Sequence, residues 1–248
     1  MEAYTDFSYV YDEFMEETPY DEWCDRIRKL LAAEGITDGL ILELGCGTGA
    51  MTVRMRNAGF DMIGADISES MLQVAMSRDA EGILYLQQDM REFELYGTVR
   101  AIYSCCDSVN YLTDPQDVVR MMELVNNYLD PGGLFIFDFN TPYKYGTVIG
   151  NTVIAENRED KSFIWENYWY NEERVNEYDL TVYVREEDGR YRRFTEEHYQ
   201  RGYSPAEMIT YAEKAGMKFV AGYDDYTEDK MHEESQRVVM VLREQGKE

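Results

Sequence analysis

Positive charge is scarce in this sequence of 248 residues, which holds 24 Lys and Arg against 49 Asp and Glu and has a formal net charge of −25. Affinity for nucleic acid comes largely from contacts of Lys and Arg with phosphates. The deficit of Lys and Arg therefore excludes a broad nucleic-acid-binding surface. It is compatible only with a local basic patch. Nucleic acid is a disfavoured partner.

Long apolar runs are missing as well. No stretch approaches the ~18 consecutive apolar residues that indicate a membrane-spanning helix. The first residues, MEAYTD, lack the basic and apolar regions of a signal peptide. These absences predict a cytoplasmic protein with no membrane partner.

Histidine and cysteine are few. The two histidines, His198 and His232, have no partner cluster in the sequence. The four cysteines show no metal-ligand spacing, and without an export signal we expect reduced thiols at Cys24, Cys46, Cys105 and Cys106. The sequence therefore predicts no metal site and no serine-type catalytic triad.

Apolar residues, at 44%, are sufficient for a packed globular core, and over the first 140 residues short apolar runs alternate with helical patterns. Helices are expected over residues 20–34, after Ser68 as N-cap, and from Pro115 onward. Strands alternating with helices indicate a parallel sheet that is covered on both faces. The five expected strands are residues 40–44, 62–65, 83–86, 99–105 and 134–139.

The pattern changes after residue 140. Residues 151–200 read as strands without helices and hold ten aromatic residues. A helix then begins after Ser204, and two strands follow at residues 218–223 and 237–242. We therefore predict a core formed by residues 1–140 and 202–248, with residues 141–201 inserted as an antiparallel β lid over an acceptor site.

A glycine loop follows the first expected strand, at residues 45–49. A strand that enters such a loop and continues into a helix places backbone N–H groups at the carboxyl end of the strand, ready for an anionic or polar ligand. Gly45, Gly47 and Ala50 also fit the dinucleotide fingerprint, with Asp66 near the expected distance. Glycine spacing alone does not decide between the two kinds of ligand.

The residues around this loop carry a more specific resemblance. Residues 43–49, ELGCGTG, resemble motif I of the class I S-adenosylmethionine-dependent methyltransferases. Residues 64–68, GADIS, and 88–90, QDM, resemble their second and third motifs, and residues 129–134, LDPGGL, resemble the segment before their fifth strand. The resemblance covers residues 38–140. It implies a Rossmann-like, doubly wound α/β fold: a seven-stranded, mostly parallel sheet whose last strand is antiparallel.

The resemblance also implies S-adenosyl-L-methionine as the cofactor and gives the matched residues their roles. Asp66 would accept hydrogen bonds from both ribose hydroxyls, because a carboxylate has lone pairs for both. Asp89 would accept from the adenine amino group, with the Met90 backbone beside it. Glu43 would orient the loop or meet the cofactor's amino group, and Cys46 would act as a small packing residue. The other expected cofactor-binding residues are Gly45, Gly47, Gly49, Ile67 and Cys106.

The loop after the fourth strand should bring the acceptor to the methyl donor. The Asn-Pro-Pro-Tyr motif common in amino-group methyltransferases of nucleobases or glutamine is absent there, and the similar residues 140–143 follow the fifth strand, where we expect a loop. We predict Tyr111 and Asp107 as the catalytic side chains, acting as orienters or weak bases. Similar small-molecule N-methyltransferases often carry a catalytic histidine at the place of Tyr111, so the identity of the base stays open.

Aromatic residues are expected around the acceptor and the cofactor. The insertion offers an apolar wall with a few hydroxyls, whose aromatic faces suit a cation: Phe163, Trp165, Tyr168, Trp169 and Tyr170. An N-terminal helix is expected to cap the cofactor with Tyr4, Phe7, Tyr9, Tyr11 and Phe14.

The sequence thus predicts an enzyme that transfers a methyl group from S-adenosyl-L-methionine to a small-molecule acceptor, at nitrogen rather than oxygen, by direct displacement. Two alternatives remain: a non-catalytic protein that binds S-adenosylmethionine, and an NAD(P)-dependent oxidoreductase that uses the same glycine loop. The oligomeric state stays open, and a homodimer is compatible with the sequence.

Overall fold

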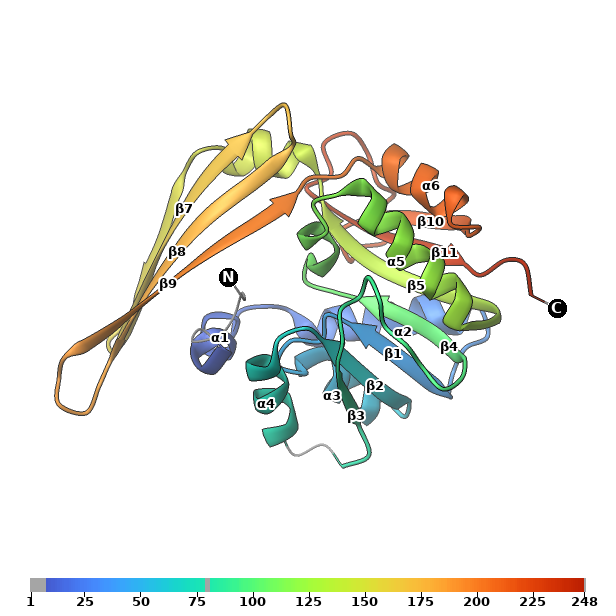
Figure 1. Cartoon of the computed structure of the whole chain (residues 1–248), viewed down its shortest axis with the longest axis horizontal. Coiled ribbons are helices and arrows are strands. Elements are labelled where there is room, and N and C mark those ends of the chain that lie inside the picture. The colour runs from blue at the N-terminus through green and yellow to red at the C-terminus, as the bar shows by residue number, and fades with distance from the viewer. Residues whose placement is uncertain (1–7, 79–80, 248) are drawn as a thin grey trace.

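The computed structural model describes residues 8–78 and 81–247, which form two separate sheets (Figure 1). The larger sheet has the strand order β10-β11-β5-β4-β1-β2-β3. Its strands are β1 (Leu40–Leu44), β2 (Asp61–Asp66), β3 (Leu84–Gln87), β4 (Val99–Ser104), β5 (Leu129–Asn140), β10 (Lys218–Asp224) and β11 (Arg237–Arg243). β11 runs antiparallel to both neighbours, and all other pairs are parallel. The expected α/β fold with an antiparallel last strand is confirmed.

The helices begin where the local sequence signals place them. Ser68 caps α4 by accepting from the N–H of Met71, Asp114 caps α5, and Ser204 forms a capping box with Glu207 at α6. The helices are α1 (Ser8–Phe14), α2 (Tyr20–Ala33), α3 (Ala50–Asn57), α4 (Glu69–Ser77), α5 (Pro115–Tyr128) and α6 (Pro205–Lys214), with a 3-10 turn η1 (Ser108–Tyr111) and a π-helix η2 (Lys144–Ile149). Among the described residues, none of these helices has the length and apolar character needed to cross a membrane.

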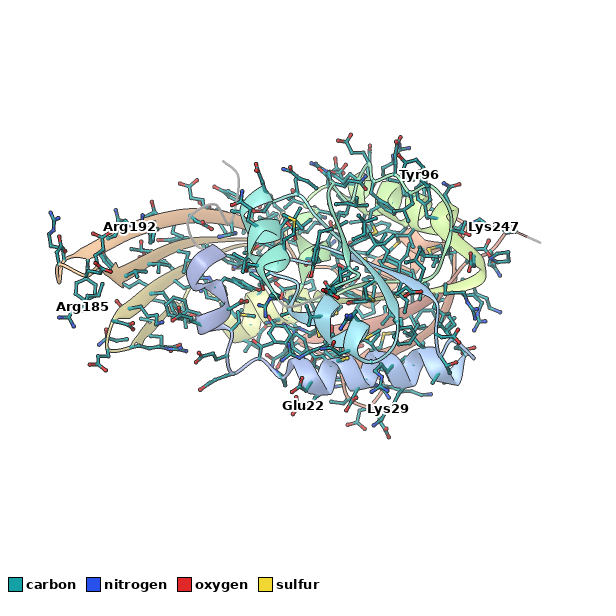
Figure 2. The ribbon with its side chains drawn as sticks, turned by 90° about the horizontal axis from the view of Figure 1, so that it is seen from below. Glu22, Lys29, Tyr96, Arg185, Arg192 and Lys247 are labelled. Atoms are coloured by element: carbon teal, nitrogen blue, oxygen red, sulfur yellow. The ribbon has the colours of Figure 1, made fainter. Side chains whose placement is uncertain are left out.

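The central strands of the large sheet are buried on both faces, which explains why strands such as β1, β5 and β11 read as continuous apolar runs. On β5, Phe135 and Phe137 pack on the face covered by α5 and α6, while Leu134 and Ile136 pack on the face covered by α2 and α3. The outer surfaces of the helices are charged: Glu22 and Lys29 on α2 point outward in Figure 2.

A four-stranded antiparallel sheet is inserted between β5 and α6, within the range expected for the insertion. Its strands are β6 (Val153–Asn157), β7 (Lys161–Tyr170), β8 (Val175–Arg185) and β9 (Tyr191–Arg201). It projects from the core, and α1 lies against it (Figure 1). Phe14 of α1 meets Phe163 of β7 edge-on, with 5.0 Å between ring centroids. The sheet thus has an apolar face of its own, centred on Val182.

Two segments differ from the expectations. β5 begins at Leu129 rather than at residue 134, because Leu129 already pairs with Val99 of β4. Residues 142–149, expected to start as a loop, are helical: the Thr141 hydroxyl accepts from the N–H of Lys144, and the Lys144 ammonium donates to Asn140. These side-chain hydrogen bonds cap the turn and lead the chain from β5 into the inserted sheet.

Candidate active site

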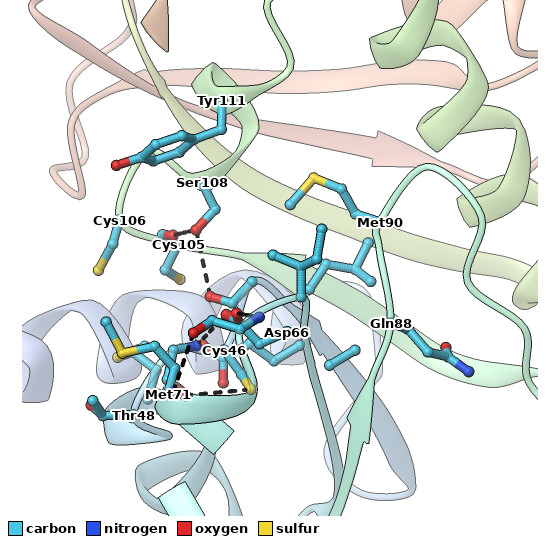
Figure 3. Close-up of a pocket in the computed structure, with 18 of the residues that line it drawn as sticks. Cys46, Thr48, Asp66, Met71, Gln88, Met90, Cys105, Cys106, Ser108 and Tyr111 are labelled. Carbon is cyan, nitrogen blue, oxygen red and sulfur yellow. Dashed lines mark hydrogen bonds between the residues drawn. The ribbon is translucent and has the colours of Figure 1, made fainter. Parts of the chain in front are cut away.

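A cavity of about 390 Å³ lies at the carboxyl ends of β1, β2 and β4. Figure 3 shows Tyr111, Ser108 and Cys106 at one end, Gln88 at the other, and Asp66 between them. The loops that follow β1, β2, β3 and β4 form the walls, and α1 and α2 each add a tyrosine. This is the edge of an α/β sheet where ligands bind.

The glycine loop after β1 forms one wall. The N–H of Gly45 donates to the carbonyl oxygen of Ala65 at 2.8 Å, which joins the loop to the end of β2. A Cβ atom added at Gly47 would meet no atom within 4 Å, so this residue borders open space. At Gly49 it would lie 2.5 Å from the Tyr85 hydroxyl, so Gly49 allows close packing behind the wall and does not itself line the cavity.

Asp66 ends β2 in the middle of the cavity wall. Its two carboxylate oxygens accept one backbone hydrogen bond each, from Gly47 and Ser68, both at 2.8 Å. Burial raises the pKa of this carboxyl group, and the two N–H groups oppose that shift. A carboxylate oxygen accepts more than one hydrogen bond, so each oxygen retains a lone pair for a ligand hydroxyl.

Glu43 lies beneath the glycine loop and is 2% exposed. Its carboxyl group accepts hydrogen bonds from the hydroxyls of Thr52 on α3 and Tyr103 on β4. Burial raises the pKa of Glu43 to about 8, so the protonated form is favoured at neutral pH. Burial also raises the pKa of the Cys46 thiol well above its usual value. The carboxyl group of Glu43 beneath the loop and the thiol of Cys46 within it are therefore both uncharged at neutral pH.

The segment after β3 forms the far end of the cavity. Gln88, Asp89 and Met90 line it, as does the exposed Ile67 after β2. Nε of Arg91 lies 3.0 Å from each carboxylate oxygen of Asp89. Burial would raise the pKa of Asp89, but the hydrogen bonds from Arg91 outweigh it and hold that pKa below its usual value. Asp89 is an ionised acceptor that already has one partner.

A sharp turn follows β4, where Cys106 and Asp107 both have positive φ, 59° and 51°. Such values are uncommon outside glycine. The buried carboxylate of Asp138 on β5 holds the turn: it accepts from the N–H groups of Cys106 and Asp107 at 3.2 and 2.7 Å and from the Tyr226 hydroxyl at 3.0 Å. The turn brings Cys106 to the cavity wall.

The Asp107 side chain, by contrast, does not line the cavity. Its Oδ2 accepts from Nε2 of Gln200 at 2.7 Å, and its Oδ1 lies 3.4 Å from the guanidinium of Arg237. These contacts place the Asp107 side chain behind the residues that line the cavity. The catalytic role expected of Asp107 stays a prediction.

Tyr111 ends η1 and lines the cavity near Cys106. Its hydroxyl lies 3.1 Å from Nδ1 of His198, and Nε2 of His198 lies 3.2 Å from Oε2 of Glu196. His198 and Glu196 both come from β9 and are buried. The expectation that His198 has no partner cluster is therefore wrong. The missed signal was the alternation along β9, which places Glu196, His198 and Gln200 on one buried face.

None of the aromatic residues expected as an acceptor wall lines this cavity, and their role at the acceptor stays a prediction. Successive residues of a strand point to opposite faces of its sheet. Tyr168 and Tyr170 are exposed on one face, while Phe163 and Trp165 on the other pack with α1. Trp169 stacks on the ring of the buried Tyr145.

The N-terminal helix lies beside the cavity, and the role expected for it as a cap over the cofactor stays a prediction. Tyr11 lines the cavity, together with Tyr20 of α2, whereas Phe14 packs on the small sheet. Tyr4 and Phe7 lie outside the described residues, as does the side chain of Tyr9. The described residues also contain no group of three or more His, Cys, Asp and Glu that could hold a metal ion.

Asp12 fastens α1 to the wall formed by the glycine loop. Its Oδ1 accepts from the Thr48 hydroxyl at 2.6 Å, and its Oδ2 pairs with Arg78 at the end of α4. Nε of Arg78 in turn donates to the carbonyl oxygen of Thr48 at 2.6 Å. These three residues form a clasp between α1, the glycine loop and α4.

Known proteins resemble the chain along its whole length. A family model described as a methyltransferase domain matches residues 41–133. A protein of Geobacillus sp. (strain WCH70), named as a candidate methyltransferase, is 33% identical over 97% of this chain and 99% of its own length. The crystal structure of an S-adenosylmethionine-dependent methyltransferase from Clostridium acetobutylicum ATCC 824 is 26% identical, has a TM-score of 0.88, and is matched over 99% of this chain and 100% of that one.

A more local likeness covers about half of each chain. The dTDP-3-amino-3,4,6-trideoxy-alpha-D-glucopyranose N,N-dimethyltransferase of Streptomyces venezuelae is 29% identical over 121 residues, 48% of this chain and 51% of that one.

The chain belongs to the class I S-adenosylmethionine-dependent methyltransferases. It is a methyltransferase whose cofactor is S-adenosyl-L-methionine, and the oxidoreductase and non-catalytic alternatives are set aside.

Proposed function

We propose that this enzyme transfers the methyl group of S-adenosyl-L-methionine to a nitrogen atom of a small-molecule amine. The observation that carries the proposal is one continuous cavity, which joins the glycine loop and Asp66 to Tyr111. Donor and acceptor would share this space. Its volume of about 390 Å³ is in the range of small-molecule sites, ~300–1,000 Å³.

The cofactor fits the half of the cavity around Asp66. Asp66 would accept from the two ribose hydroxyls with the lone pairs that Gly47 and Ser68 leave free. Asp89, fixed by Arg91, would accept from the adenine amino group. Glu43 and Gly49 would shape the loop from behind. The full set proposed for the cofactor is Glu43, Gly45, Cys46, Gly47, Gly49, Asp66, Ile67, Asp89, Met90 and Cys106.

The acceptor would enter at the Tyr111 end, where Tyr11, Tyr20 and Cys106 complete the wall. The bound cofactor supplies an electrophilic methyl group on a cationic sulfur, and displacement then depends largely on position and on exclusion of water. Tyrosine rings suit positively charged groups, which favours a protonated amine at this end of the cavity. The substrate in the name of the Streptomyces relative is likewise an amino sugar.

Residues 141–201 would act as a lid that completes the acceptor side, and residues 1–140 and 202–248 as the core. Two contacts support this division: His198 of β9 meets Tyr111, and Gln200 of β9 meets Asp107. Through them the lid reaches the turn that follows β4.

The test is a panel of acceptors in matched pairs. The amino sugar nucleotide named for the Streptomyces relative is compared with its hydroxyl counterpart, alongside simple amines, phenols and carboxylic acids. Release of S-adenosylhomocysteine is measured for the wild type and for Asp66→Ala. With the cofactor at a concentration that half-saturates the wild type, we expect release with amines in the wild type and much less in Asp66→Ala. Turnover confined to phenols or carboxylates would contradict the proposal.

A further inference from the structure

We propose that Tyr111, His198 and Glu196 form a proton relay, in which Tyr111 touches the acceptor and His198 and Glu196 act through it as positioning residues. The inference rests on the function proposed above and adds the path by which the acceptor nitrogen loses its proton. It also supplies, from a distant strand, the imidazole that the loop after β4 lacks.

The geometry defines the direction of the relay. The Tyr111 hydroxyl lies 3.1 Å from Nδ1 of His198, and Nε2 of the same ring lies 3.2 Å from Oε2 of Glu196. A carboxylate accepts hydrogen bonds, so the relay assigns the imidazole proton to Nε2, beside Glu196, and leaves Nδ1 to accept from the Tyr111 hydroxyl. A phenol oxygen has two lone pairs, so the Tyr111 hydroxyl can donate to Nδ1 and also accept from an N–H group of the acceptor.

Burial strengthens the interactions within this chain of groups. His198 is 3% exposed and Glu196 is 7% exposed, and hydrogen bonds shielded from water are electrostatically stronger. Within residues 8–78 and 81–247, the groups that face the imidazole include Tyr111 from η1, Glu196 from its own strand and the ring of Tyr178 from β8, 5.6 Å away between centroids. Asp107, four residues before Tyr111 in the chain, is engaged with Gln200 and Arg237 instead.

The step balances without another reagent. A protonated amine has no lone pair for attack and must first lose a proton. Its N–H bond breaks as an O–H bond forms on Tyr111, while the proton of Tyr111 moves to Nδ1 of His198. The resulting imidazolium is paired with the Glu196 carboxylate. The freed pair on nitrogen then forms the N–C bond, and the electrons of the broken C–S bond stay on sulfur.

The first test measures directly which ring nitrogen of His198 carries the proton, and it requires no acceptor. The chain has two histidines, so the spectrum of protein labelled with ¹⁵N-histidine holds two imidazoles, and His232→Gln assigns them. We expect His198 to carry its proton on Nε2, and Tyr111→Phe to shift the Nδ1 resonance toward that of a nitrogen that accepts no hydrogen bond. A proton on Nδ1, or an Nδ1 resonance unmoved by Tyr111→Phe, would overturn the relay.

The second test follows methyl transfer to the amino sugar nucleotide against pH. We expect kcat at neutral pH to fall about 10²-fold or more in Tyr111→Phe and in His198→Gln. The double variant should lose no more than either single variant, because the two groups act as a unit. The loss should shrink as pH rises, since the acceptor then arrives deprotonated. His232→Gln should keep wild-type rates.

The outcomes separate the two proposals. If the wild type methylates no amine but the spectra show the expected proton position, the proposed function fails and the hydrogen-bonded chain stands without an acceptor to serve. If the wild type methylates the amine and both variants match it at every pH, the relay is overturned and the function stands. A loss of equal size at every pH would also overturn the relay, since it indicates a structural role. Unchanged affinity for S-adenosylmethionine in Tyr111→Phe, which keeps the ring, shows that the cofactor site is intact.

Discussion

The carboxylate of Asp66 accepts a 2.8 Å hydrogen bond from the backbone N–H of Gly47, which fastens the end of β2 to the glycine loop after β1. The two motifs that resemble the methyltransferase family are therefore one physical unit. A change at either residue should act on the shape of the cofactor site as well as on direct contacts.

Replacement of Asp66 tests the ribose contact. Asp66→Ala should weaken binding of S-adenosylmethionine by about 2–3 kcal/mol, the scale of lost hydrogen bonds to a charged group. Calorimetric titration measures it. Asp61→Ala, at the exposed start of the same strand, is the matched control and should bind normally. Equal affinities in both variants would remove Asp66 from the site.

Gly47 and Gly59 form a matched pair for the steric role of the loop. Both have positive φ, +52° and +104°, and an added Cβ would meet no atom within 4 Å at either. Gly47→Val and Gly59→Val should each cost about 1–2 kcal/mol of stability through backbone strain. Gly47→Val alone should abolish cofactor binding, because its side chain enters the cavity. Normal binding in a folded Gly47→Val would show that the ligand lies elsewhere.

Glu43 should impose a pH dependence on stability. Its pKa rises from the ordinary 4.5 to about 8 in the folded protein, so the folded state binds more protons between these values. The contribution of Glu43 to the free energy of unfolding is therefore full at low pH and is lost as pH rises through this window. Glu43→Gln, which stays neutral, should lack this loss. Urea unfolding from pH ~5 to ~9 compares the two; parallel curves would contradict the account.

The clasp at Asp12 should control the residence time of the cofactor. Asp12→Ala removes the links from α1 to Thr48 and Arg78 and should speed dissociation of S-adenosylmethionine several-fold. The pair is half-exposed, so stability should change by less than about 1 kcal/mol. Asp21→Ala, which breaks the exposed pair with Arg54, is the control. Stopped-flow displacement gives the rates, and equal rates would mean that α1 does not gate the site.

The sequence predicted the parallel part of the fold well because its signals are local. Apolar runs, the cap at Ser68 and the proline at residue 115 each act within a few residues, and the helices begin where they indicate. The start of β5 was missed because the pairing of Leu129 with Val99 is a contact between distant segments.

In the candidate site, too, the sequence predicted residues with local signals and missed those that depend on contacts between distant segments. Residues that follow strand ends, such as Asp66 and Tyr111, could be placed because parallel strands share one edge. The partners of Tyr111 could not, since His198 and Glu196 lie on β9 and depend on how a separate sheet docks. The sequence could not separate Tyr168 and Tyr170 from Phe163 on the opposite face, because aromatic content alone does not say which face of a strand is buried.

Transfer of a labelled methyl group tests the central claim most directly. The wild type is incubated with S-adenosylmethionine carrying a deuterated methyl group and with the amino sugar nucleotide, and the product is analysed by mass spectrometry and NMR. The account predicts the label on the amine nitrogen in the wild type and much less labelled product with Asp66→Ala when the cofactor only half-saturates the wild type. Label on oxygen, or no transfer to any amine by a protein that binds the cofactor, would contradict it.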